Sequence, residues 1–190
     1  MSGRSDPAAA FRFGTMLNAD NLFLVGPMGS GKSAVGRRLA GRLGLDFIDS
    51  DAEIEARTGV DIPYIFEQEG EAGFRARERD LLNELTARSR VLVATGGGAI
   101  LDPDTRARLR SRGRVVYLRT SVNQQLARTR RSGHRPLLRT PDPLGTLERL
   151  LEVRAPLYEE TADIVVDTDG RKVKSVVEDV LRRLDAARSA

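Results

Sequence analysis

The feature that most constrains the fold is the stretch GPMGSGKS, Gly26 to Ser33, which lies between a short apolar run and a helical pattern. It matches the Walker A pattern, G-x4-G-K-[ST], in full. The glycines let the backbone curl around an anion, and the N-terminus of the following helix adds positive potential. A strand, this loop and a helix in succession predict an α/β fold with a phosphate-binding loop.

The loop also predicts how the chemistry is divided among its residues. Lys32 is positioned to reach the β- and γ-phosphates of a nucleoside triphosphate, and the Ser33 hydroxyl is positioned to coordinate Mg²⁺. Lys32 stands out because nearly all of the 31 Lys and Arg residues of the chain are arginine. A compact ammonium on a flexible stem follows a moving phosphoryl group better than a wide guanidinium does. The expected nucleotide-binding segment of the loop is Gly29, Ser30, Gly31, Lys32, Ser33 and Ala34.

Short apolar runs alternate with helical patterns along the rest of the chain. We expect strands at 21–25, 45–49, 91–95, 114–118 and 162–167, and helices at 33–43, 51–57, 71–87, 103–111, 121–130, 144–158 and 172–187. This alternation predicts a five-stranded parallel sheet flanked by helices. Ligands of such sheets bind beyond the carboxyl ends of the strands, so the segments that follow the first three strands should meet at one rim.

Two acids follow the second expected strand. Asp49 and Asp51 are two residues apart, which on an extended chain points both carboxylates to the same side. Phosphoryl transfer to an alcohol needs one carboxylate near the acceptor hydroxyl and another near the metal. The alternative is that Asp51 only caps the helical residues that follow it, Ala52 to Arg57. The nearby phosphate loop favours the functional interpretation.

Three glycines, Gly96 to Gly98, follow the third expected strand in the stretch TGGGAI. They remove every side chain from a place where a ligand can lie against the backbone. A flexible turn is the alternative, but three consecutive glycines cost more backbone entropy than an ordinary turn requires. We therefore favour close approach of a ligand.

Composition excludes several classes of function. The 190 residues include no cysteine, so disulfides, thiolate zinc sites and cysteine nucleophiles are excluded. No apolar run reaches transmembrane length, and we expect no membrane partner and a cytoplasmic location. The net charge of +4 suits nucleic acid, but aromatic residues make up only 5% and do not alternate with basic ones. Nucleic acid is therefore not the expected partner. We expect residues 1–20 to be a flexible extension and residues 21–190 to form a single domain.

Six motifs taken together resemble the shikimate kinase family. They are GPMGSGKSAVGRRLA, FIDSDAEIEARTG, FRARE, TGGGAI, RPLL and RAPLY, in this order, and the resemblance runs from about residue 21 to the end. The phosphate loop alone is shared by many enzymes, whereas the whole set is highly specific. The resemblance implies a small P-loop kinase with a five-stranded parallel sheet, a substrate-binding helical segment and a mobile lid at about 128–143.

The resemblance also implies roles for individual residues. Asp51 would contact the acceptor hydroxyl of shikimate and act as base, and Asp49 would lie near Mg²⁺, which Ser33 also binds. Arg75 and Arg154 would grip the shikimate carboxylate, a task that suits guanidinium forks. The resemblance implies that Lys32, Asp51 and Arg135 are catalytic. It adds Gly97 and Gly98 as substrate contacts, and Arg128 and Arg135 as ATP contacts. The adenine would lie near residues 167–171.

The expected activity is ATP- and Mg²⁺-dependent transfer of the γ-phosphoryl group to the 3-hydroxyl of shikimate, by a monomer. A gluconate-kinase-like enzyme is the alternative, since it shares the loop and a carboxylated polyol substrate. A nucleotide-binding module that senses ATP without transfer is a second alternative, against which Lys32, Asp49 and Asp51 argue.

Overall fold

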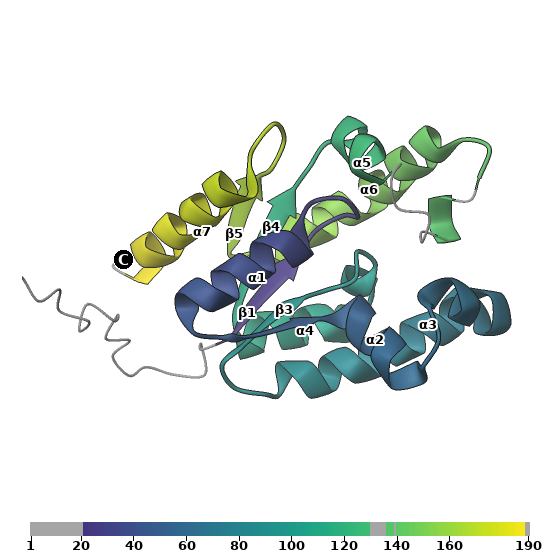
Figure 1. Cartoon of the computed structure of the whole chain (residues 1–190), viewed down its shortest axis with the longest axis horizontal. Coiled ribbons are helices and arrows are strands. Elements are labelled where there is room, and N and C mark those ends of the chain that lie inside the picture. The colour runs from purple at the N-terminus through teal and green to yellow at the C-terminus, as the bar shows by residue number, and fades with distance from the viewer. Residues whose placement is uncertain (1–20, 130–135, 139, 189–190) are drawn as a thin grey trace, which may run out of the picture.

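The computed structural model describes residues 21–129, 136–138 and 140–188. Its centre is a parallel sheet of five strands in the order β2-β3-β1-β4-β5, which confirms the predicted fold class. Figure 1 shows the sheet with helices on either side. The strands are β1 Leu22–Val25, β2 Asp46–Asp49, β3 Val91–Ala94, β4 Arg114–Arg119 and β5 Ile164–Asp167.

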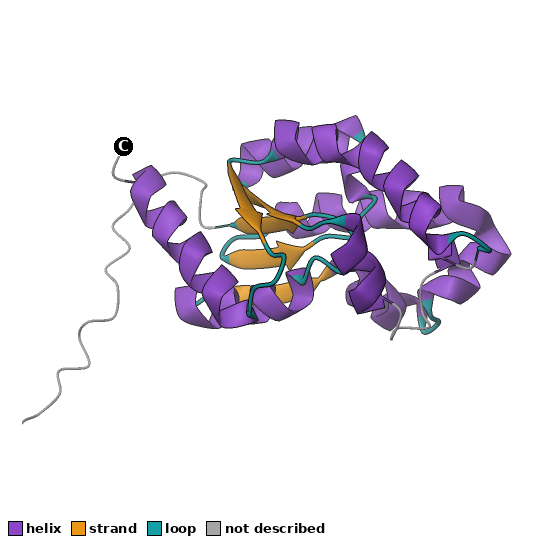
Figure 2. Ribbon diagram, turned by 90° about the horizontal axis from the view of Figure 1, so that it is seen from above, coloured by secondary structure: helices purple, strands orange, loops and turns teal. Residues whose placement is uncertain are grey.

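Helices cover both faces of this sheet, as the view from above shows (Figure 2). The helices α1 Lys32–Leu43 and α7 Val173–Arg188 pack on one face. The other face carries α2 Ser50–Thr58, α3 Ile62–Thr86, the short 3₁₀ helix η1 Ala99–Leu101, α4 Pro103–Arg112 and α6 Pro143–Thr161. The helix α5 Val122–Thr129 packs on α6, and the 3₁₀ turn η2 Pro136–Leu138 contacts α3 and α6.

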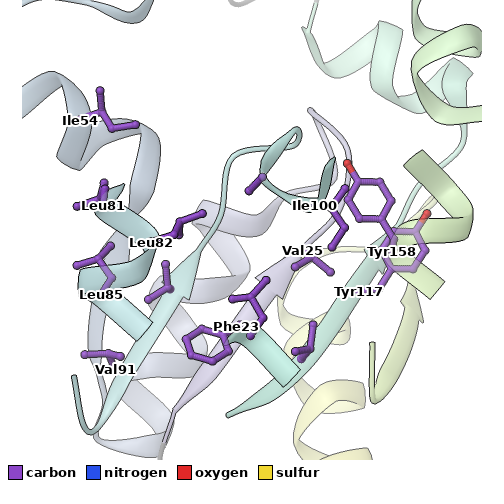
Figure 3. Close-up of a cluster of buried hydrophobic side chains, with 14 of the residues drawn as sticks. Phe23, Val25, Ile54, Leu81, Leu82, Leu85, Val91, Ile100, Tyr117 and Tyr158 are labelled. Atoms are coloured by element: carbon purple, nitrogen blue, oxygen red, sulfur yellow. The ribbon is translucent and has the colours of Figure 1, made fainter. Parts of the chain in front are cut away.

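The central strands β1, β3 and β4 are buried on both sides, so their alternate residues enter two separate cores. In β1, Phe23 and Val25 belong to the core under α3, α4 and α6, while Leu22 and Leu24 belong to the core under α1 and α7. Figure 3 shows the first core, where the ring of Tyr158 from α6 stacks on Tyr117 from β4. Continuous apolar strands of this kind are typical of a parallel sheet covered on both faces.

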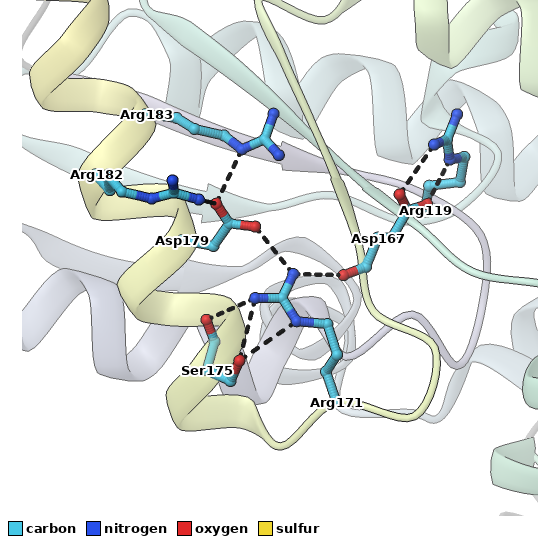
Figure 4. A network of polar contacts seen from close by, with 7 residues as sticks. All are labelled: Arg119, Asp167, Arg171, Ser175, Asp179, Arg182 and Arg183. Atoms are coloured by element: carbon cyan, nitrogen blue, oxygen red, sulfur yellow. Dashed lines mark hydrogen bonds and ion pairs between the residues drawn. The ribbon is translucent and has the colours of Figure 1, made fainter.

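Polar groups fix the helix α7 to the edge strand β5 (Figure 4). Asp179 accepts hydrogen bonds from Arg171, Arg182 and Arg183, and Arg171 also donates to the carbonyl of Asp167 in β5. Although burial opposes the shift, these three guanidinium groups hold the pKa of Asp179 far below its usual value. The side chain of Asp179 is 9% exposed, so its carboxylate is largely removed from solvent and connects α7 to the edge of the sheet.

The helix α3 differs most from the sequence prediction. We expected a helix only at 71–87, but α3 begins at Ile62, with Asp61 as its N-cap, and contains a break at Gly70 (φ 69°). Positive φ is favourable for glycine, so the chain turns there and the helix resumes. The first part is short, and its Pro63 lies in the first turn, where proline is compatible with a helix. None of the described helices combines the length and apolar content that a bilayer span requires.

Candidate functional site

The phosphate loop owes its shape to glycines with left-handed backbone angles. The φ values are 145° at Gly26, 75° at Gly29 and 93° at Gly31, a region that other residues rarely adopt. A Cβ on Gly26 would also lie 2.6 Å from the carbonyl oxygen of Leu118 in the neighbouring strand β4. The motif positions are therefore glycines for backbone reasons that hold without any ligand.

Lys32 is the first residue of α1, and its side chain lies over the loop. Its Nζ donates to the carbonyl oxygens of Gly26 at 2.7 Å and Pro27 at 2.8 Å, and to Ser30 Oγ at 3.3 Å. These oxygens hold the ammonium at the mouth of the loop. The predicted nucleotide contacts from Gly29 to Ala34 thus form one contiguous curl ending in the first turn of α1.

The two predicted metal ligands are brought together across the rim. Ser33 Oγ donates to Asp49 Oδ2 at 2.5 Å. A hydroxyl and a carboxylate suit Mg²⁺, which binds proteins through one or two such oxygens and takes its other ligands from water and phosphate. No cluster of three or more His, Cys, Asp or Glu that could hold a metal occurs in the described part of the chain. The residues present therefore fit an ion carried largely by the nucleotide.

Asp49 also caps the next helix, a role that one alternative had given to Asp51. Asp49 Oδ1 accepts from the backbone N–H groups of Asp51 and Ala52, so Asp49 is the N-cap of α2. The capping interpretation offered for Asp51 is wrong, because α2 begins one residue earlier than expected. Asp51 instead lies in the first turn, with its carboxylate beside Gly96. Ser50, between the two acids, accepts from the Gly96 N–H at 2.9 Å and ties α2 to the glycine turn.

An open cleft lies beside these residues, with about 500 Å³ of empty space when the adjoining open solvent is included. Six separate segments line it, and they include all five predicted substrate contacts: Asp51, Arg75, Gly97, Gly98 and Arg154. Met28 of the phosphate loop, Leu137 of η2 and the apolar side chains of Ile62, Phe66 and Phe74 complete the wall. The cleft thus combines an apolar side with a polar one, as small-molecule sites commonly do.

Arg75 is held in the cleft by a carboxylate that the sequence argument did not single out. Glu78, one turn further along α3, accepts from Arg75 Nη1 at 2.5 Å and is 2% exposed. Burial raises the pKa of Glu78 to about 7, the positive charge of Arg75 opposes the rise and the negative charge of Asp51 adds to it. The i,i+3 spacing of Arg75 and Glu78 in FRARE was the available signal.

The glycine turn after β3 is built differently from the phosphate loop. None of Gly96, Gly97 and Gly98 has a positive φ. A Cβ on Gly98 would overlap the Arg75 guanidinium, and one on Gly96 would overlap Glu78. A Cβ on Gly97 would meet only ordinary contacts, the nearest being Gly26 O and Met28 N at 3.5 Å. Gly96 and Gly98 are therefore glycines because side chains pack over them, not because the backbone is strained.

Arg154 approaches the same turn from α6. It is 4% exposed, and its Nη1 would lie 3.7 Å from a Cβ on Gly97. None of the described carboxylates forms an ion pair with Arg154. A guanidinium desolvated to this degree is a strong site for an anionic group from outside the protein.

Arg128 links the phosphate loop to the turn after β5. Its Nη1 donates to the carbonyl oxygen of Gly29 at 2.9 Å, and its Nη2 donates to the carbonyl oxygen of Thr168 at 3.0 Å. The expected adenine region at 167–171 therefore does lie beside the loop. Arg135, the predicted lid arginine, lies outside the described residues, as do residues 1–20.

Comparisons with known proteins agree on one family. The shikimate kinase family model matches residues 28–185. A shikimate kinase of Halorhodospira halophila is 59% identical over 86% of this chain and 92% of that protein. A solved shikimate kinase from Acinetobacter baumannii in complex with shikimate has a TM-score of 0.87 and 48% identity, covering 89% and 94% of the two chains. A gluconokinase from Sinorhizobium meliloti, with a TM-score of 0.54 and 22% identity over 88% and 92%, is alike in fold alone.

Proposed function

Because the chain belongs to the shikimate kinase family, we propose that its cleft aligns the 3-hydroxyl of shikimate with the γ-phosphoryl group of ATP. The activity is ATP-dependent phosphorylation of shikimate, which yields shikimate 3-phosphate and ADP. The observation that carries the proposal is convergence. Asp51, Arg75 and Arg154 line one cleft, and its glycine turn adjoins Gly26 O, the atom that accepts a hydrogen bond from Lys32.

Substrate binding is assigned to the polar end of the cleft. Arg75 and Arg154 take the carboxylate of shikimate, and the N–H groups of the turn at Gly97 and Gly98 add neutral donors. Glu78 keeps the Arg75 guanidinium directed into the cleft. The ring then lies against the apolar wall of Ile62, Phe66 and Phe74.

The transfer step is assigned to Asp51 and Lys32. Asp51 accepts the proton of the 3-hydroxyl while the oxygen of that hydroxyl bonds to the γ-phosphorus. The bond between the γ-phosphorus and the leaving oxygen of ADP breaks in line with it. Lys32 follows the charge of the moving phosphoryl group. Ser33 and Asp49 would hold Mg²⁺, which when bound neutralises the phosphate oxygens. Holding two oriented reactants contributes roughly 7–11 kcal/mol to such reactions.

The remaining assignments complete the proposal. Arg128 lies at the adenine side, and Arg135 is assigned to the segment that covers the phosphates. We also propose that the protein acts as a monomer, as expected from the sequence. The need for ATP supports the cytoplasmic location that we expected from the sequence.

An assay of ADP release tests the substrate. With ATP and Mg²⁺ present, shikimate should support turnover and gluconate should not. Turnover with gluconate and silence with shikimate would replace the proposal by the gluconate-kinase-like alternative.

The role of Asp51 has its own test, the Asp51→Asn variant. Removing a base that takes a proton in the transition state should lower kcat by about 10²–10⁴-fold. The affinity for ATP, measured by calorimetry, should be unchanged because Asp51 faces the acceptor side. A variant with wild-type kcat would remove Asp51 from the base role.

A further inference from the structure

A buried tyrosine stands behind the glycine turn. Tyr158 lies on α6 one turn beyond Arg154, is fully buried, and stacks on Tyr117 with ring centroids 4.9 Å apart (Figure 3). It is not among the residues that line the large cleft. Whatever it contributes to the site is therefore transmitted through other groups.

The Tyr158 hydroxyl reaches the turn directly. It donates a hydrogen bond to the carbonyl oxygen of Gly97 at 2.5 Å, across 61 positions of sequence. Burial raises the pKa of Tyr158, and the positive charge of Arg154 opposes the rise only in part. The hydroxyl thus stays protonated, and remains a donor, throughout the range in which the protein works.

The hydrogen bond fixes more than one atom, because the peptide unit is planar. The described residues contain no cis peptide bond, so the carbonyl of Gly97 and the N–H of Gly98 point in opposite directions. With the carbonyl directed at Tyr158, the Gly98 N–H is directed away from it. A hydrogen bond to the carbonyl also polarises the peptide and strengthens its N–H as a donor.

The N–H groups of Gly97 and Gly98 donate to no described residue, whereas the neighbouring N–H groups of Gly96 and Ala99 bond to Ser50 Oγ and Gly96 O. A guanidinium lies beside each of the two residues: a Cβ on Gly97 would contact Arg154, and a Cβ on Gly98 would overlap Arg75. Two backbone donors between two guanidinium groups make a corner suited to a carboxylate.

We propose that Tyr158 is a positioning residue for carboxylate recognition, which fixes the Gly97–Gly98 peptide so that its N–H meets the substrate carboxylate between Arg75 and Arg154. The inference rests on the proposed function. It adds a residue that does not touch the substrate and that governs how well the glycine turn binds it.

The competing explanation is that Tyr158 only fills the core, and Tyr117 offers a matched control. Both are buried tyrosines of one stacked pair, and a Phe substitution at either keeps the ring. They differ in surroundings, since the charges that act on the Tyr117 hydroxyl come from Glu159, Arg119 and Asp167, whereas Arg154 and Glu78 of the cleft act on Tyr158. A core-filling role predicts similar effects of the two substitutions on substrate binding.

The experiment compares Tyr158→Phe and Tyr117→Phe in the full chain by steady-state kinetics. Tyr158→Phe should raise the KM for shikimate about 3–10-fold, the usual effect of one hydrogen bond, with the KM for ATP unchanged. Tyr117→Phe should change neither KM. For a shikimate analogue with a hydroxymethyl group in place of the carboxylate, the difference between the two proteins should disappear. Wild type and Tyr158→Phe should bind this analogue equally.

Three results would overturn the inference: an unchanged KM for shikimate in Tyr158→Phe, equal changes in the two variants, or an equal loss for shikimate and the analogue. Thermal unfolding of the same samples identifies purely structural damage, and a lowered Tm with an unchanged KM counts as the first of these results. Failure of the proposed function would instead be visible in the wild type, as an absence of turnover with shikimate.

Discussion

The two sides of the cleft are built on different principles. The phosphate side is one uninterrupted segment whose glycines at 26, 29 and 31 have left-handed φ values. The acceptor side is assembled from α2, α3, the turn after β3, η2 and α6, and its glycines have ordinary φ values. Binding of phosphate therefore depends on the backbone conformation of one segment, whereas binding of the acceptor depends on side chains that only the fold brings together.

This contrast has a consequence for mutations. Changes on the phosphate side should act on transfer and leave acceptor affinity intact, because the loop keeps its shape without help from the acceptor residues. A substitution on the acceptor side should also disturb its neighbours, because the residues there contact one another: Arg75, Glu78, Asp51 and the glycine turn. Four substitutions test this difference, beginning with the largest expected effect.

Lys32→Met should give the largest loss. Removing the charge that follows the phosphoryl group should lower kcat by about 10³-fold, the upper range for one preorganised electrostatic donor. Shikimate affinity, measured by calorimetry without nucleotide, should not change. Lys174→Met on the exposed face of α7 is the control. A matching loss of shikimate affinity would show that the two sides are not separable.

Arg154→Lys should act on the acceptor side alone. An ammonium cannot reproduce a bidentate guanidinium, so the KM for shikimate should rise roughly 10–100-fold, as expected for a lost charged hydrogen bond. The KM for ATP should stay within twofold. Arg149→Lys, exposed on the same helix, should leave both constants unchanged. An unaltered KM for shikimate in Arg154→Lys would remove Arg154 from the carboxylate site.

Gly98→Ala tests how the acceptor side transmits a change. Its Cβ would displace the Arg75 guanidinium, which must then leave its position against Glu78. Overpacking of this kind costs about 1–3 kcal/mol, and we expect a rise of about tenfold in the KM for shikimate. Gly41→Ala is the matched control, since a Cβ there meets no atom within 4 Å. Wild-type kinetics in Gly98→Ala would contradict the packing explanation of the turn.

Glu78→Gln tests the buried charge through the pH dependence of stability. The folded pKa of Glu78, about 7, lies above its unfolded value of 4.5. The protonated carboxyl therefore stabilises the fold below pH 4.5, and this contribution is lost as the pH rises through 7. Glutamine stays neutral, so the variant should gain about 1 kcal/mol relative to wild type between pH 6 and 8.

Urea unfolding at pH 6, 7 and 8 measures this difference. Glu71→Gln is the control, because Glu71 pairs with the same Arg75 guanidinium at the protein surface, where an ion pair contributes little. The Glu71→Gln variant should follow the wild-type profile. A Glu78→Gln profile parallel to wild type would show that Glu78 is ionised throughout this range.

The agreement between sequence and structure follows the same division. Every predicted strand is present within two residues of its expected limits, and in β1, β3 and β4 burial on both faces leaves a continuous apolar signal. The first part of α3 was not predicted, because it is short and the break at Gly70 separates it from the longer helical pattern that follows. Glu78 was overlooked for another reason: its charge looks like one of many surface carboxylates until α3 is packed against the glycine turn.

The sequence by itself determined the sheet, the phosphate loop and the identity of the residues at the rim, since local backbone preferences and apolar periodicity act over a few neighbouring positions. Only the tertiary structure decided that Asp49 caps α2, that Arg75 rests on a buried Glu78, and that Tyr158 holds Gly97 across 61 positions. These contacts join segments far apart in the chain, and their free energy depends on distances and on exclusion of water that no local pattern encodes.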